Sequence, residues 1–118
     1  MEVILSSLLA QLSWAHYYAI TGRRAADYVA KNLHEKILQS THFHTDIARA
    51  IKEGFMATEE EFLAIAKQNN YGDGTTAIVA FISENGKKLT VGNIGDSEAV
   101  LCRGGKVRIS LPHKDSLC

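Results

Sequence analysis

The sequence has little proline, little cysteine and no excess charge of either sign. Pro112 is the one proline, and Cys102 and Cys118 lack both the C-x-x-C spacing of a metal knuckle and the density of a secreted disulfide scaffold. Thirteen basic residues balance thirteen acidic ones and are scattered, so no basic stripe exists to follow a nucleic-acid backbone. These features predict a cytoplasmic or nuclear protein without a nucleic-acid partner.

Charged residues are also absent from the start of the chain, since none follows Glu2 until Arg23. Residues 3–20 have the length of a short membrane span, but serine, glutamine, histidine and tyrosine dilute the run. A signal peptide would need basic residues where Glu2 stands. We therefore interpret residues 1–21 as a divergent apolar segment that packs on, or substitutes for, another part of the structure, and keep a membrane anchor as the less favoured alternative.

The composition is that of one small globular domain. The chain has 118 residues, of which 46% are hydrophobic and 22% charged, which is far from the signature of disorder and too short for two ordinary domains. No internal repeat, low-complexity tract or proline-rich linker divides it.

Two amphipathic helices are predicted in the first half of the chain. Between residues 23 and 38 apolar side chains recur at every fourth position, which places them on one helix face: Ala25, Val29, Leu33 and Ile37. Thr45 or Asp46 caps a second helix that runs to about Gln68. Its apolar stripe is Ile47, Ile51, Phe55, Phe62, Ile65 and Ala66. Within it, Gly54 costs ~1 kcal/mol against alanine, and Thr58-x-x-Glu61 has the pattern of a capping box, which marks a restart or kink.

Extended structure is predicted after the turn-rich residues 69–74. Residues 75–83 are β-branched and small apolar residues, Asn85-Gly86 turns into a strand at 88–94, and Gly95-Asp96 turns into a strand at 98–103. Gly104-Gly105 then begins a hairpin into residues 106–111. The predicted fold class is α+β, with two helices packed on one face of an antiparallel β-meander.

The first of these strands is apolar on both faces. An antiparallel sheet with one solvated face alternates apolar and polar residues, but residues 77–82 do not. The two helices cover one face. The other face is expected to meet a second sheet, the uncharged N-terminal segment or a partner chain.

Ordered motifs in the second half of the chain point to a family. Residues 74–77 read Gly-Thr-Thr-Ala, residues 91–103 read Val-Gly-Asn-Ile-Gly-Asp-Ser-Glu-Ala-Val-Leu-Cys-Arg, and Gly-Gly-Lys at 104–106 leads to His113. These resemble, in order and spacing, the G-[ST]-T-A, V-x-N-x-G-D-S-R-A-V-L and L-[ST]-x-D-H motifs of protein phosphatase 2C, a family of metal-dependent (PPM-type) Ser/Thr phosphatases. Residues 22–29 resemble the helix start after the family's D-G-H-G-G motif. Residues 22–118 are therefore assigned to a partial PPM-type phosphatase domain.

The resemblance implies an α-β-β-α sandwich, here partial, with a binuclear Mg²⁺ or Mn²⁺ site at the edge between two sheets. It also implies phosphoprotein substrates, whose phosphoserine and phosphothreonine are hydrolysed by metal-bound water. Carboxylates hold such hard ions, and the ions lower the pKa of the bound water. Several carboxylates must therefore converge.

The metal motif itself is replaced in this sequence. If Gly22 is the last glycine of D-G-H-G-G, the preceding four positions hold Tyr18, Ala19, Ile20 and Thr21, none of which supplies the aspartate. The family's N-terminal strands, with a further acidic ligand and a phosphate-binding arginine, are expected to have no counterpart in residues 1–17, and its later aspartates to lie beyond residue 118. No catalytic residue is assigned, and Mg²⁺ or Mn²⁺ is not expected to bind tightly.

Asp96, in G-D-S, is the one candidate metal ligand, as a peripheral one, because the matching family aspartate lies near the cluster. The competing interpretation is a turn aspartate, since one carboxylate does not hold Mg²⁺. Glu98 stands where the family has arginine, and Pro112 where it has aspartate. The residues that match the family's scaffold are Gly22, Gly74, Thr75, Thr76, Gly95, Asp96, Ser97 and His113.

Other reactive side chains receive structural interpretations. His42 and His44 are expected to be surface loop residues, because no third ligand is spaced to complete a zinc site. Residues 59–61, three glutamates, are expected on a solvated helix face. Cys102 is expected in the core.

Four hypotheses follow. The first is a truncated phosphatase 2C relative that is inactive alone, and the second is a non-catalytic binding or regulatory module that associates with another protein or a second copy through its exposed sheet. The third is a membrane-anchored fragment. The fourth is an incomplete gene product.

Overall fold

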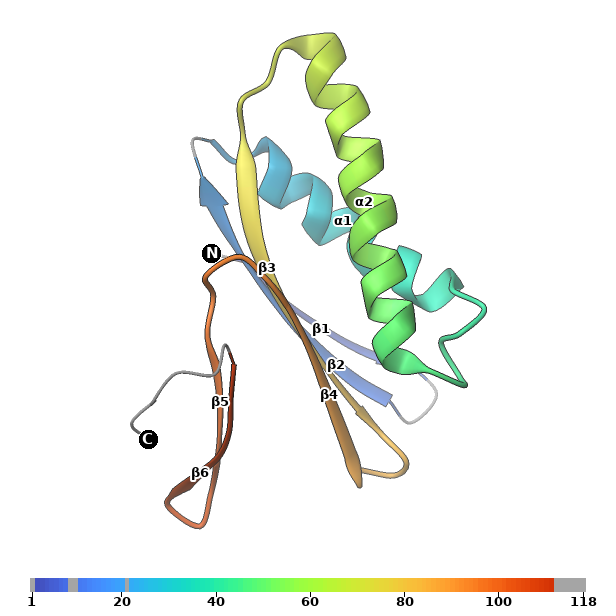
Figure 1. Ribbon diagram of the computed structural model, residues 1–118, viewed down its shortest axis with the longest axis vertical. Helices are drawn as coiled ribbons and strands as arrows, with labels where there is room; N and C mark the ends of the chain where they lie inside the picture. The colour runs from blue at the N-terminus through green and yellow to red at the C-terminus, as the bar shows by residue number, and fades with distance from the viewer. Residues whose placement is uncertain (1, 9–10, 21, 112–118) are drawn as a thin grey trace.

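The computed structural model describes the backbone of residues 2–8, 11–20 and 22–111 and the side chains of residues 22–107. Two helices lie against one face of the larger sheet, and a two-stranded hairpin stands apart from it (Figure 1). The elements in order are β1 (Glu2–Leu8), β2 (Gln11–Ile20), α1 (Arg24–Gln39), α2 (Ile47–Asn69), β3 (Gly74–Ser83), β4 (Lys88–Ile94), β5 (Ala99–Arg103) and β6 (Lys106–Leu111). The α+β class predicted from the sequence is confirmed.

The larger sheet has the order β1-β2-β3-β4, with every neighbouring pair antiparallel. β2 pairs with β3 from Leu12 opposite Ile82 to Ile20 opposite Gly74. The N-terminal segment thus extends the sheet sideways, because β3 offers it a free row of backbone donors and acceptors. The expectation that this segment covers the second face of β3 is therefore wrong. Within the part of the chain that the structure describes, neither helix combines the length and the hydrophobicity that a membrane span requires.

The two helices begin and end close to their predicted limits. The Asp46 carboxylate accepts a hydrogen bond from the Arg49 backbone N–H at 3.2 Å and caps α2, as the sequence predicts. The helix ends where Asn70 adopts the left-handed conformation. The predicted restart at Thr58 is wrong, because its hydroxyl donates to the Gly54 carbonyl at 2.8 Å within a continuous helix.

The core lies between the helices and the helix-facing side of β3. Its members come from α1, the loop between the helices, α2 and β3: Ala26, Ala30, Leu33, Ile37, Phe43, Ile47, Ala50, Ile51, Ala77, Val79 and Phe81. Phe43 and Phe81 meet edge to face with their ring centroids 6.1 Å apart. Ile65, predicted in the stripe of α2, is exposed, and Thr58 is buried instead.

The predicted single meander is divided into two sheets. The described strands β4 and β5 belong to different sheets, separated by a bend at Gly95 and Asp96. The β5–β6 hairpin turns at Gly104-Gly105, both with positive φ, as expected. Cys102 is exposed on β5, which corrects its expected place in the core, because a hairpin outside the main sheet has no helix layer over it.

Candidate functional site

Two predicted scaffold motifs meet at the start of β3. The hydroxyls of Thr76 and Ser97 lie 2.8 Å apart within hydrogen-bond distance. Gly95 has φ 92°, and a side-chain Cβ there would overlap the Thr76 side chain. The glycine is required both by its conformation and by this close approach. Gly74, Thr75, Thr76, Gly95 and Ser97 are therefore neighbours, whereas His113 lies outside the described residues.

The replaced metal motif lies on the other side of the same stretch of β3. Tyr18 is opposite Thr76, Ala19 opposite Thr75 and Ile20 opposite Gly74 in the backbone register. Thr21 lies outside the described residues. β3 is thus flanked by the two segments that the resemblance assigns to metal binding, and the β2 segment holds no carboxylate-bearing residue.

Asp96 is exposed in the bend after β4. Among the residues whose side chains are described, no group of three His, Cys, Asp or Glu is placed to hold a metal ion. Mg²⁺ and Mn²⁺, the ions that the resemblance implies, need several oxygen ligands. The residues present at this edge do not fit a binuclear metal centre.

A buried carboxylate that the sequence reasoning missed is Asp73, whose side chain is 1% exposed. It accepts hydrogen bonds from the Arg24 backbone N–H and Nε, both at 3.0 Å, and from the second guanidinium nitrogen at 2.5 Å. The Arg24 guanidinium also lies 3.9 Å from the centre of the Tyr71 ring. Gly22 has φ 153°, and a Cβ there would overlap the Asp73 carboxylate.

This cluster joins the start of α1 to the start of β3. Asp73 satisfies a free N–H of the first helical turn, where negative charge is favoured. The hydrogen bonds from Arg24 hold the pKa of the Asp73 carboxyl below its usual value, against the opposing effect of burial. The spacing of 49 residues between the partners leaves no local sequence signal, so only tertiary structure reveals the pair.

Replacement of Asp73 by asparagine is expected to lower the melting temperature at neutral pH and to flatten its acid dependence. The folded-state pKa is depressed, so the carboxylate stabilises the protein above its unfolded pKa of about 3.9 and loses this effect as pH falls through the folded pKa. Thermal melts followed by circular dichroism across acidic pH measure both effects. Glu60→Gln, which neutralises an exposed carboxylate on α2, is the matched control. Parallel wild-type and Asp73→Asn curves would contradict the assignment.

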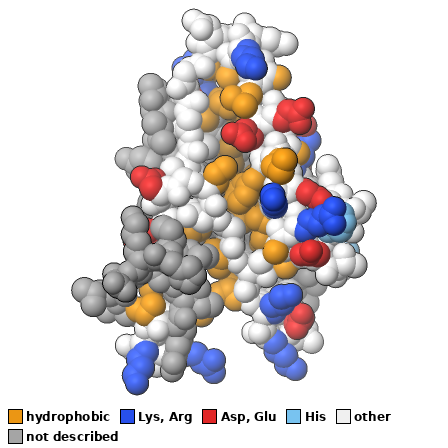
Figure 2. All heavy atoms as spheres, viewed as in Figure 1, with side chains coloured by type: hydrophobic (Ala, Val, Ile, Leu, Met, Phe, Trp, Pro, Cys, Tyr) orange, Lys and Arg blue, Asp and Glu red, His pale blue; other side chains and the backbone are white. Residues whose placement is uncertain are grey.

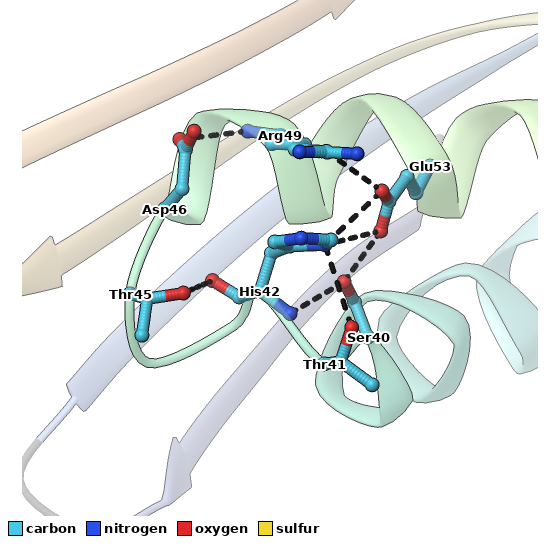
Figure 3. A network of polar contacts seen from close by, with 7 residues as sticks. All are labelled: Ser40, Thr41, His42, Thr45, Asp46, Arg49 and Glu53. Carbon is cyan, nitrogen blue, oxygen red and sulfur yellow. Dashed lines mark hydrogen bonds and ion pairs between the residues drawn. The ribbon is translucent and has the colours of Figure 1, made fainter.

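A network of polar contacts connects the loop between the two helices to the first turns of α2 (Figure 3). The Glu53 carboxylate accepts from the Ser40 hydroxyl at 2.7 Å and the Arg49 Nε at 3.1 Å, and lies 3.2 Å from Nδ1 of His42. The hydrogen bond from Ser40 is the main reason that the pKa of Glu53 is lowered. His42 is half-buried in this network, a correction to its expected exposure, whereas His44 is exposed. The network is structural.

The predicted exposure of the three glutamates at residues 59–61 of α2 is confirmed for two of them. Glu61 accepts hydrogen bonds from the Tyr28 hydroxyl at 2.8 Å and the Lys36 Nζ at 2.5 Å, and so ties α2 to α1. The bond from Lys36 is the main cause of its lowered pKa. Glu59 and Glu60 are exposed.

An apolar pocket of about 160 Å³ opens between α1, α2 and the start of β3. Val29, Leu33, Phe55 and Phe62 form much of its wall, and the Asp73 segment lies at its edge. The Asp73 carboxylate is already occupied by Arg24. Glu59, an exposed residue of α2, is the other acidic side chain in the lining, so the pocket is an apolar space bordered by one carboxylate outside the Arg24–Asp73 pair.

The chain is similar to known proteins over most of its length. A family model described as Protein phosphatase 2C matches residues 7–117. Among curated relatives, Probable protein phosphatase 2C 59 of Arabidopsis thaliana is 39% identical over 94 residues, which cover 79% of this chain and 30% of the relative. The rice (Oryza sativa subsp. japonica) protein of the same name is 37% identical, with 79% and 28% covered. Probable protein phosphatase 2C 69 of Arabidopsis thaliana is 37% identical, with 79% and 26% covered. The chain thus spans less than a third of these relatives.

Proposed function

The chain belongs to the protein phosphatase 2C family, and from this membership we propose that it supplies the family's scaffold strands without hydrolysing phosphoproteins on its own. The family is generally metal-dependent and acts on phosphoserine and phosphothreonine in proteins. The observation that carries the proposal is the residue set beside Thr76, where β2 brings Tyr18 and Ala19 in place of the motif's aspartate and glycine.

The geometry supports this proposal at three points. Thr76 and Ser97, from two of the motifs, lie within hydrogen-bond distance of each other, which supports a scaffold role for these motifs. Among the described side chains, Asp96 belongs to no group of three His, Cys, Asp or Glu residues that could hold a metal ion. Asp73 is occupied by Arg24, so it is not available to replace the lost ligand. A metal-activated water needs ligands that these residues do not provide.

The test is phosphate release from a phosphoserine or phosphothreonine peptide by the purified chain in Mn²⁺ or Mg²⁺. We expect no release above the buffer rate, with or without a chelator, while a full-length phosphatase of the family serves as the positive control. Turnover that disappears when EDTA is added would overturn the proposal, since it would require a working metal site.

A second candidate function is that of a non-catalytic binding module. β4 is the edge of the larger sheet, and among the described strands it pairs with β3 alone. Exposed apolar residues follow the same edge, with Met56 61% and Ile94 40% exposed. An edge strand beside apolar surface favours association with another chain.

A further inference from the structure

We propose that the occupant of the β4 edge is a second copy of this chain, joined to the first by antiparallel pairing of the two β4 strands. This inference deepens the binding-module function and does not depend on the absence of hydrolysis. A second copy is the favoured partner because the charges along the β4 edge are self-complementary.

The two ends of β4 carry opposite charge. Lys88 begins the strand, with Lys87 before it, and Asp96 follows its end at Ile94. All three charged side chains are exposed, and none of them forms an ion pair among the described residues. In antiparallel self-pairing, each basic end necessarily meets the acidic end of the other copy.

The register can be specified from the sequence of the strand. If the twofold axis passes through Gly92, Lys88 comes opposite Asp96 of the second copy and Thr90 comes opposite Ile94. Residues opposite each other in an antiparallel pair point to the same face. Because Thr90 and Ile94 both lie in β4 and are four positions apart, they share one face of the strand, so this register places the helices of both copies on one face of an eight-stranded sheet.

The surface beside β4 gives this pairing an apolar component. A groove of about 330 Å³ runs between α2 and β4, and its lining includes Phe55, Met56, Val91 and Ile94. At Gly92 the helix packs directly on the strand, since a Cβ there would overlap the Ile51 side chain. Figure 2 shows hydrophobic side chains along the middle of this face, with charged side chains beside them. Pairing brings the two grooves together and removes Met56 and Ile94 from water.

Sedimentation equilibrium of the full chain tests the proposal through a charge swap. We expect a reversible dimer, whose dissociation constant rises about three- to tenfold with either Lys88→Glu or Asp96→Lys. The double variant Lys88→Glu/Asp96→Lys restores opposite charges across the interface and should return the dissociation constant toward the wild-type value. Lys106→Glu, at the turn of the separate β5–β6 hairpin, is the matched control and should leave it unchanged.

Hydrogen exchange supplies a readout that needs no variant. Amides of β4 are expected to become more protected as the concentration of the wild-type chain rises, while those of the β5–β6 turn do not change. Three results would each overturn the proposal. The wild-type chain could stay a monomer at all concentrations, or form a dimer that neither charge reversal weakens. The double variant could also form a dimer as weak as the two single reversals combined predict. None of these measurements depends on phosphatase activity. The proposed dimer can therefore be refuted without refuting the proposed lack of hydrolysis, and the reverse.

Discussion

Replacement of Leu33 by alanine is expected to lower the free energy of unfolding by about 2–5 kcal/mol. Leu33 is 0% exposed at the centre of the α1 face that packs on α2 and β3. Removing its branched end leaves a cavity that its neighbours fill only in part. Urea denaturation followed by circular dichroism measures the change, and for so small a domain much of the total stability is expected to disappear.

The matched control is Leu63→Ala on α2. Leu63 is 47% exposed, so truncation removes little buried area and is expected to cost about 0.5 kcal/mol or less. The two substitutions delete the same atoms and differ in burial. Equal losses at the two positions would contradict the location of the core between the helices and β3.

Replacement of Gly54 by alanine is expected to destabilise the protein by up to about 2 kcal/mol, although alanine is the better helix former by ~1 kcal/mol. The added Cβ would overlap the Ile37 side chain and lie 3.2 Å from the Ile37 backbone nitrogen. Overpacking of this kind typically costs about 1–3 kcal/mol, so the steric effect outweighs the propensity. The same urea titration measures the result.

A double-mutant cycle isolates the cause. In an Ile37→Ala background the side-chain overlap is gone, and Gly54→Ala should cost less than in the wild type or become stabilising. Strong positive coupling between the two positions is therefore expected. Stabilisation of the wild-type chain by Gly54→Ala would show that α1 and α2 lie further apart than the structure has them.

The helices and the later strands could be predicted because their signals are local. The spacing of Leu33 and Ile37 sets a helix face, and Asp46 caps α2 through its own neighbour Arg49. The capping-box pattern at Thr58 misled because the same hydroxyl can bond back to Gly54 inside a helix. Local pattern does not distinguish these two uses of a threonine.

What could not be predicted depends on distant partners. The uncharged N-terminal segment reads equally well as cover for a sheet face or as a strand, and only its pairing with β3 decides. Asp73 looks like a turn residue until Arg24 is placed beside it. At the candidate site, the sequence identified the motif residues, and the structure added that Thr76 lies between the replaced motif and Ser97.

We propose that this chain has the phosphatase 2C scaffold without a complete set of metal ligands, and a calorimetric titration with Mn²⁺ tests this proposal most directly. The wild-type chain is expected to show no saturable binding in the micromolar range, and Asp96→Asn is expected to give the same trace. Stoichiometric Mn²⁺ binding that is tight in the wild type and weakened by Asp96→Asn would contradict the account, because it would show that a metal site forms around the bend after β4.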